Sequence, residues 1–276
     1  MQVIRYQSPA DFLSVTEVLR SAEIVRTNLI SSIANSVANG FRVYEAYYWW
    51  AVKERNKTLG IAIRTAPYGY VISPMSQEVT MALLAQITVI DSKADEFSGP
   101  KSVINIIENN LRLKPEKIES ELIYKLTTLN DIALQGVVRV AAKEDYELVL
   151  DWMNAFMEET GITFYDLENV INTALMRGAY CFLEIDSSPV SMGGSSAVIE
   201  VLGQKIGRVG PIWTPKEFRK HGYASSITYH LTQKLLAEGA TPALYTQAEN
   251  PTSNKIYQNL GYELVDEIRR IKFRCA

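Results

Sequence analysis

The segment best suited to do chemistry is residues 209–224, where a strand-like run passes through a turn into a helix-like run. A helix start offers unpaired N–H donors and the positive end of the helix dipole, and both attract anions. Gly222 would let these donors come close to a ligand, and Ala224 keeps the first turn free of bulk. A cationic rim would come from Arg219, Lys220 and His221. The segment is therefore suited to bind a pyrophosphate.

The pattern of residues 219–224, Arg-x-x-Gly-x-Ala, is short, and it is also typical of a solvent-exposed turn that has no function. Its setting favours the anion site. The strand-like run Ile206 to Trp213 precedes it, and the run that follows places Ile227 and Leu231 on one face of a helix that Gly239 would end.

A second segment, residues 250–262, combines a helix start with a tyrosine inside the helix. Asn250 before Pro251 is also an ordinary helix start, in which Asn caps backbone donors and Pro takes the first helical position. Tyr257 has two interpretations as well, because it could be a packed core aromatic or a hydroxyl that takes part in chemistry.

Together the two segments resemble the GNAT superfamily of N-acetyltransferases. Residues 219–224 match the acetyl-CoA motif of that family, Gln/Arg-x-x-Gly-x-Gly/Ala, which lies between a strand and a helix. Residues 250–262 resemble its second cofactor segment, an Asn, a helix bearing a Tyr, and then Gly-Phe/Tyr. The resemblance covers roughly Val137 to Phe273, and no motif extends it to the first half of the chain.

The resemblance implies a site in which two strands splay apart and the pantetheine arm of acetyl-CoA lies between them. The pantetheine arm would pair with the backbone of the earlier strand. Tyr257 would place its hydroxyl near the thioester sulfur as the catalytic general acid. The cofactor-binding residues that the resemblance implies are Ile212, Trp213, Thr214, Arg219, Lys220, His221, Gly222, Tyr223, Ala224, Asn250 and Asn254. The reaction would move an acetyl group from acetyl-CoA to a primary amine by direct attack, without a metal.

The general base is not identified by the sequence. Many relatives carry a Glu on the strand before the loop, but residues 206–214 contain no carboxylate. Glu184, Glu200 and Glu217 are candidates that we do not rank, and Cys181 is interpreted as a buried hydrophobe without a nucleophilic role.

Two alternatives remain open beside acetyl transfer. The chain could be a non-catalytic coenzyme A-binding sensor or scaffold, which the missing carboxylate favours and the presence of Tyr257 disfavours. It could also transfer a longer acyl group. The acceptor amine and the oligomeric state are not readable from the sequence.

The composition indicates a globular protein with two packed halves. The chain has 276 residues, 47% of them apolar and 21% charged. A formal charge of −3 gives no positive field for nucleic acid or an anionic membrane. Residues 1–12 lack a secretory pattern, so we expect a cytoplasmic protein. Cys181 and Cys275 should be reduced thiols, and with His221 and His230 they offer no zinc-ligand spacing.

We expect the boundary between the halves near residue 133, giving an N-terminal α+β half (1–132) and a GNAT acetyltransferase domain (133–276). Beyond the boundary the predicted class is α+β with a mixed sheet. Its expected elements, in order, are a strand at 137–141, helices at 144–157 and 167–176, strands at 179–185, 190–201 and 206–213, a helix after Gly222, a strand at 243–247, a helix from Pro251 and terminal strands.

The first half is harder to interpret. We expect helices at 17–38, at 76–84 and from Gly99-Pro100 to 111, two short strands within 60–72 around a turn at 67–69, further strands at 87–90 and 122–129, and loops at 114–121 and 130–135. This half could be a degenerate copy of the same fold, with Gly99-Pro100 replacing the phosphate loop, that completes the acceptor cleft and binds no cofactor. An aromatic cluster could line that cleft, although core packing is the commoner role: Tyr44, Tyr47, Tyr48, Trp49 and Trp50.

Overall fold

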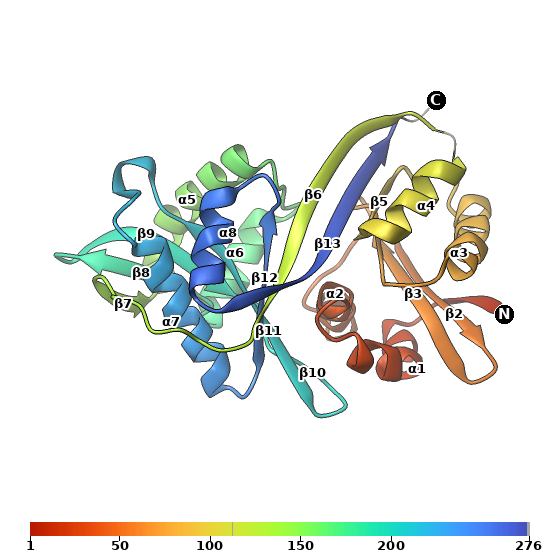
Figure 1. Ribbon diagram of the computed structural model, residues 1–276, viewed down its shortest axis with the longest axis horizontal. Coiled ribbons are helices and arrows are strands. Elements are labelled where there is room, and N and C mark those ends of the chain that lie inside the picture. Colours follow the sequence, from red (N-terminus) through yellow and green to blue (C-terminus); the bar gives the residue numbers. More distant parts are fainter. Residues whose placement is uncertain (112, 275–276) are drawn as a thin grey trace.

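The computed structural model describes residues 1–111 and 113–274, and its strands form one continuous mixed sheet (Figure 1). The predicted α+β class is confirmed. Cys275 lies outside the described residues, whereas Cys181 is a buried free thiol. No helix in the described ranges is both long enough and apolar enough to cross a membrane.

In the described part of the first half, strands and helices follow one another along the chain. They are β1 (Gln2–Tyr6), α1 (Pro9–Ala22), α2 (Asn28–Ala38), β2 (Tyr47–Glu54), β3 (Lys57–Thr65), β4 (Tyr70–Ile72), α3 (Gln77–Ile90), β5 (Glu96–Pro100), α4 (Lys101–Leu111) and β6 (Pro115–Leu126).

The second half follows after a connection without regular structure, residues 127–136. Its elements are β7 (Val137–Val140), α5 (Tyr146–Thr160), α6 (Leu167–Met176), β8 (Tyr180–Ile185), β9 (Ser188–Ser195), β10 (Ile199–Val201), β11 (Gln204–Trp213), α7 (Tyr223–Ala237), β12 (Thr241–Gln247), α8 (Pro251–Asn259) and β13 (Tyr262–Phe273).

The two halves repeat one order of elements. When the short hairpin strand β10 is left out, each half runs strand, two helices, three strands, helix, strand, helix, strand. The pairing repeats as well, because β1 to β4 are antiparallel neighbours and β4 is parallel to β5, while β7, β8, β9 and β11 are antiparallel neighbours and β11 is parallel to β12. We call β1–β6 the N-terminal repeat and β7–β13 the C-terminal repeat.

The repeats exchange their last strands. In the sheet order β5-β13-β6-β12, each long last strand lies between the last two strands of the other repeat. β6 and β13 pair with each other along most of their length and run side by side between the two halves in Figure 1. The cores are shared in the same way, since Ile271 and Phe273 of β13 pack in the N-terminal core and Tyr124 and Leu126 of β6 in the C-terminal core.

Each sheet residue in the C-terminal repeat faces one of two helical layers because successive side chains of a strand point to opposite faces. In β8, Cys181 and Leu183 pack in the cluster that contains α7 residues. Tyr180 and Phe182 pack in the cluster that contains α5 and α6 residues.

Several boundaries differ from the sequence predictions. Residues 87–90 end helix α3 instead of forming a strand, and residues 115–121 belong to strand β6 instead of a loop. The predicted helix at 17–38 is two helices, and the predicted strand at 190–201 is two strands, β9 and β10. Gly99-Pro100 ends β5 and starts no phosphate loop; the counterpart of that loop is residues 73–76, between β4 and α3.

Candidate active site

The loop between β11 and α7 ends in a helix start that has no capping side chain. Gly222 is the N-cap of α7 with φ +82°, a left-handed conformation that glycine adopts without strain, and no side chain caps the helix. The first N–H groups of a helix have no partner within the helix. Ser226 N–H bonds to Gly222 O at 3.0 Å, so the helix begins directly after the glycine. The donors of residues 223–225 remain for an external acceptor.

The strands that flank α7 separate as predicted by the resemblance. β11 pairs with β12 only from Ile206 to Arg208. A bulge between Val209 and Ile212 then turns β11 toward β9, while the rest of β12, Leu244–Gln247, pairs only with β6. The edges of β11 and β12 that face one another are therefore unpaired beyond Arg208.

The end of α5 holds both sides of this gap. Glu159 Oε2 accepts a bond from Arg219 Nη2 at 2.9 Å, on the loop after β11. The carbonyl oxygen of Thr160 accepts a bond from Gln247 Nε2 at 2.7 Å, at the end of β12. Neighbouring residues at the end of one helix therefore bind both the loop after β11 and the end of β12, which bridges the gap between the strands.

Arg219 braces the loop and does not point freely toward a ligand. Its Nε donates to Thr214 O at 2.9 Å, and its guanidinium lies 5.2 Å from the centre of the buried Trp213 ring. Lys220 and His221 are exposed at the rim of the loop, and His221 stacks on Tyr223.

The remaining loop residues serve mainly through their backbone. Ile212 pairs with Gly193 in β9, and its side chain packs in the core beneath α7. The Thr214 hydroxyl lies 2.8 Å from that of Ser191, and Ala224 is half-buried in the first turn of α7.

Helix α8 places two asparagines beside the end of β12. Asn250 is the N-cap of α8, since its side-chain oxygen accepts from Ser253 N at 3.0 Å, so the capping role considered from the sequence is present. Asn254 donates weakly to the carbonyls of Gln247 and Ala248, at 3.4 and 3.3 Å. Its Oδ1 atom is buried and has no hydrogen-bond partner within the described part of the chain. A buried acceptor without a donor is costly, which fits an external N–H group there.

Tyr257 is buried in α8 and packs edge-on to Tyr262, with ring centres 6.4 Å apart. Burial raises the pKa of Tyr257 to about 12, against a smaller lowering by a hydrogen bond between its hydroxyl and that of Ser253. The hydroxyl therefore keeps its proton at neutral pH.

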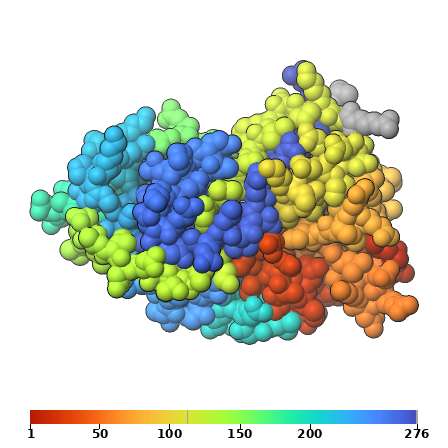
Figure 2. Space-filling view, in the orientation of Figure 1, coloured from red at the N-terminus to blue at the C-terminus, as the bar shows by residue number. Residues whose placement is uncertain are grey.

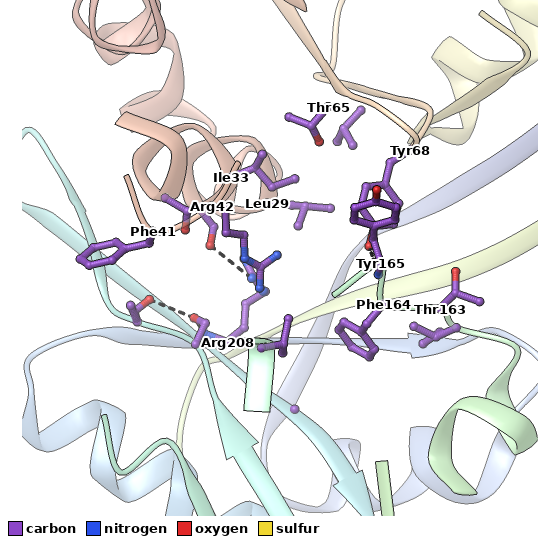
Figure 3. Close-up of a pocket in the computed structure, with 18 of the residues that line it drawn as sticks. Leu29, Ile33, Phe41, Arg42, Thr65, Tyr68, Thr163, Phe164, Tyr165 and Arg208 are labelled. Carbon is purple, nitrogen blue, oxygen red and sulfur yellow. Dashed lines mark hydrogen bonds between the residues drawn. The ribbon is translucent and has the colours of Figure 1, made fainter. Parts of the chain in front are cut away.

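A cavity of about 1240 Å³ lies between the two repeats, and none of its lining residues belongs to α7 or α8. Its walls come from α2, the β3–β4 turn, the α5–α6 connection and the bulge of β11, including Gly210 and Pro211. Figure 3 shows Arg42 and Arg208 reaching into it toward one another, and Tyr68, Phe164 and Tyr165 on another wall. Of the aromatic cluster, Tyr44 lines the cavity, whereas Trp49 and Trp50 are core residues.

The three carboxylates named from the sequence do not converge on the gap. Glu184 binds Arg139, and Glu200 and Glu217 are exposed. Glu121, which the sequence did not single out, lies opposite Gln247 in the β6–β12 pair. It shares a face of β6 with Glu119, which lines the cavity.

The carboxyl of Glu121 is perturbed by its surroundings. Burial raises its pKa, with a smaller rise from Glu119 and a lowering by Arg270. Glu121 makes no ion pair with another described residue. The sequence alone does not distinguish Glu121 from other glutamates. It becomes notable because β6 pairs with β12, whose residues lie more than a hundred positions later in the chain.

The corresponding loop of the N-terminal repeat lacks these features. Ser76 is the N-cap of α3 and its hydroxyl accepts from Val79 N at 3.3 Å, so the helix start is capped from within. β4 and β5 also stay close together. The approach is so tight that a Cβ atom added at Gly99 would lie only 2.8 Å from Ile72 O. Within the described residues, no group of His, Cys, Asp and Glu is arranged to hold a metal ion.

Comparison with known proteins agrees with this geometry. A model of the FR47-like protein family matches residues 191–271. The whole chain is similar to the structure of a GNAT-family acetyltransferase from Colwellia psychrerythraea, at 15% identity and a TM-score of 0.62, covering 99% of this chain and 100% of that one. No curated protein matches the sequence.

Two further structures are similar over nearly the full length. One is a GCN5-related N-acetyltransferase from Sphaerobacter thermophilus, at 11% identity and a TM-score of 0.62, covering 99% of this chain and 96% of that one. The other is a tandem GNAT protein from the clavulanic acid biosynthesis pathway, at 9% identity and a TM-score of 0.60, covering 100% and 99% of the two chains.

The chain therefore has the GNAT acetyltransferase fold, with an FR47-like segment in its C-terminal part. The fold is present twice, and the prediction of a GNAT-like N-terminal copy is confirmed. At these identities the similarity to solved structures defines the fold, and the activity has to be argued from the site.

Proposed function

We propose that the protein is an N-acetyltransferase that moves an acetyl group from acetyl-CoA to a primary amine. The observation that supports this most is the combination of an uncapped, glycine-initiated helix with two strands that separate beside it. The helix start suits a pyrophosphate, and the gap suits an extended pantetheine arm. The buried, unpartnered Asn254 Oδ1 supports an amide N–H in the same place.

The proposed site divides the work between residues of three elements. Backbone N–H groups of the loop and of residues 223–225 bind the anionic part of acetyl-CoA, Lys220 adds positive charge, and the His221 ring lies beside it at the rim. Arg219 acts as a positioning residue through Thr214 and Glu159. The unpaired edge of β11 at residues 212–214 orients the arm, with Asn250 and Asn254 on the other side.

Tyr257 would donate the proton that the departing thiolate needs. A pKa of about 12 keeps the hydroxyl protonated, and the buried setting excludes competing water. Direct attack by the amine requires no covalent intermediate on the protein. Cys181 is buried and its pKa is raised by burial, so it stays without a proposed role.

Glu121 is the carboxylate that we propose as the proton acceptor for the amine. A carboxyl with a raised pKa is a better base near neutral pH than an exposed one. Its place next to the end of β12, on the same face of β6 as the cavity-lining Glu119, supports this role. The sensor alternative drew support from the missing carboxylate on β11, and Glu121 weakens that argument.

Calorimetric titration with coenzyme A and acetyl-CoA tests the cofactor assignment. The variant Gly222→Asp places a carboxylate where the pyrophosphate would lie, so binding should be lost. Gly239→Asp is the matched control, because Gly239 lies after the other end of α7 with φ +70° and has open space around it. Absence of heat with the wild-type protein, or equal affinity in both variants, would reject the assignment.

An acceptor panel with detection of the released thiol tests the reaction. Thiol release that depends on an added amine supports transfer, whereas cofactor binding without turnover on the whole panel would support a sensor or scaffold. Acyl donors of increasing length show whether the gap accepts more than acetyl. The division of the chain at 132/133 and a cytoplasmic location remain parts of the proposal.

A further inference from the structure

Three arginines line the cavity between the repeats and form no ion pair with any described residue. Arg42 follows α2, Arg177 follows α6, and Arg208 lies on β11 directly before the bulge. Several other arginines form ion pairs, such as Arg64 with Asp91 and Arg139 with Asp145. These three form what we call the arginine cluster.

Arg42 is close enough to the other two members of the cluster to affect them electrostatically. Burial is the main cause that lowers the pKa of Arg177 and of Arg208, and the positive charge of Arg42 lowers both further. Glu238 acts on Arg177 from a distance and Tyr245 on Arg208, but neither forms an ion pair with them. Figure 3 shows Arg42 and Arg208 approaching from opposite walls of the cavity.

The other charged residues that line the cavity balance one another in formal charge, since Glu96, Glu119 and Glu200 stand against Lys117, Arg270 and Lys272. Lys117 lies 2.7 Å from Glu119, and Arg270 lies 3.5 Å from Glu96 and 3.8 Å from Glu119. The positive charge of the cavity is therefore concentrated at the arginine cluster, in a protein whose net charge is −3. Unpaired cations held together at a partly desolvated site are unfavourable unless an anion binds them.

The guanidinium groups are positioned and keep donors to spare. Arg208 Nη1 donates to Asn28 Oδ1 at 2.8 Å, Arg177 Nη2 to Ser195 O at 3.3 Å, and Arg42 Nη1 to the Tyr44 hydroxyl at 3.4 Å. Each guanidinium has five N–H donors in a planar fork, which suits the oxygens of a carboxylate or phosphate. The described contacts use only part of them.

We propose that the amine acceptor of this protein carries an anionic group, a carboxylate or a phosphate, which the arginine cluster binds. That the bound molecule is an acetyl acceptor rests on the proposed function. That it carries an anionic group rests on the cavity alone. Since Arg208 adjoins the bulge that opens the gap, an acceptor anchored there has its amine directed toward the cofactor side of the sheet. Amines without an anionic group would leave the cluster unpaired and bind less well.

Anion binding is tested first, without turnover. Melting temperatures are measured with malonate and with inorganic phosphate against sodium chloride at equal ionic strength, in the Gly222→Asp background so that the loop does not respond. We expect stabilisation that is lost in Arg42→Gln and Arg177→Gln and kept in Arg177→Lys. Lys57→Gln, an exposed lysine outside the cavity, is the control and should behave as its parent. No stabilisation by either anion would overturn the proposal.

Acceptor preference is tested with matched pairs in the wild-type protein. Each amino acid is compared with its amide, and phosphoethanolamine with ethanolamine, which separates carboxylate from phosphate recognition. The anionic member should have a kcat/KM about 10- to 100-fold higher, as expected for charge-assisted hydrogen bonds, and the advantage should shrink with salt. In Arg42→Gln and Arg177→Gln the loss should fall mainly on KM for the acceptor, and kcat should change little.

The two tests separate failure of this inference from failure of the proposed function. Equal use of neutral and anionic amines would reject the anionic acceptor and leave the transferase intact. Arginine-dependent anion binding without cofactor binding or thiol release would keep the anion site and reject the transferase. A preference that survives both arginine variants would also overturn the proposal.

Discussion

At the scale of single residues, Tyr257 has a geometry compatible with both of its interpretations. It packs on Tyr262 in the core, and its protonated hydroxyl forms a hydrogen bond with the side chain of Ser253 in the same helix. Tyr257→Phe removes the hydroxyl and keeps the ring. If the hydroxyl protonates the leaving thiolate, kcat should fall about 10²- to 10⁴-fold with little change in the acetyl-CoA dissociation constant.

The measurement needs kcat, cofactor affinity and melting temperature from one preparation of Tyr257→Phe. A purely structural hydroxyl would instead cost about 1–3 kcal/mol of stability and leave kcat near the wild-type value. That result would remove Tyr257 from the catalytic residues and leave the proton to water.

Glu121 gives a second prediction at this scale, with a defined pH dependence. Burial raises its pKa in the folded protein above the ordinary value of 4.5, so the native state holds the proton more tightly than the unfolded chain. Stability should therefore fall as pH rises from the ordinary value through the raised value. Glu121→Gln should remove that loss and melt at the same or a higher temperature at pH 7.

The substitution Glu121→Gln, which should keep or raise stability at pH 7, should lower the activity. Glu121→Gln should lower kcat/KM about 10²- to 10⁴-fold and remove the decline in rate that protonation causes at low pH. Glu116→Gln is the control on the same strand, since Glu116 is exposed and does not line the cavity. An unchanged pH–rate profile in Glu121→Gln would mean that the base is elsewhere.

At the scale of elements, the two loop-helix units differ in how their helices start. Gly222 leaves the first donors of α7 unpaired, while Ser76 caps α3. We therefore expect one coenzyme A site per chain by calorimetry. Ser76→Ala should cost about 0.5–2 kcal/mol of stability without altering coenzyme A affinity. A stoichiometry of two, or a weakened affinity in Ser76→Ala, would assign a cofactor site to the N-terminal repeat.

The elements also show what a sequence reveals about such a site. The loop at 219–224 was predictable because its features are local, a glycine, a small residue and an amphipathic run. The strand at 115–121 was not, because charged residues such as Lys117 and Glu119 resemble a loop until β13 pairs with them. The run at 87–90 was ambiguous because a short apolar run fits either a strand or a buried helix end.

The parts of the site that depend on distant pairing were equally hidden. Glu121 becomes notable only when β6 pairs with β12, and the arginine cluster only when α2, α6 and β11 converge. By contrast, the sequence predicts the repeat of the GNAT-like fold, but it places the loop of the first copy at Gly99-Pro100, because the apolar run at 87–90 resembles a strand and not the end of α3.

At the scale of the whole molecule, the exchange of β6 and β13 makes the two repeats one folding unit. The connection at 127–136 runs as a band over the surface of the C-terminal repeat in Figure 2, and Asn130 N bonds to Leu260 O at 3.1 Å while Gln135 N bonds to Ser226 Oγ at 2.9 Å. The sheet and the connection therefore both join the repeats.

This arrangement predicts that neither half folds alone. A fragment of residues 133–276 lacks β6, so the position between β12 and β13 is empty, and the core loses Tyr124 and Leu126. A fragment of residues 1–132 lacks β13, so β5 and β6 lose their common neighbour and the core loses Ile271 and Phe273. Such vacancies expose unpaired strand edges together with large apolar side chains.

We therefore expect each fragment, expressed separately, to show no cooperative unfolding transition, and the two expressed together to co-purify and bind coenzyme A. The control is the intact chain cleaved by a protease at a site inserted after Ile132, which should stay associated because the exchanged strands hold the halves together. A fragment of residues 133–276 that melts cooperatively and binds coenzyme A by itself would show that the C-terminal half is an independent domain. The strand exchange would then be an addition to the active site and not a condition for it.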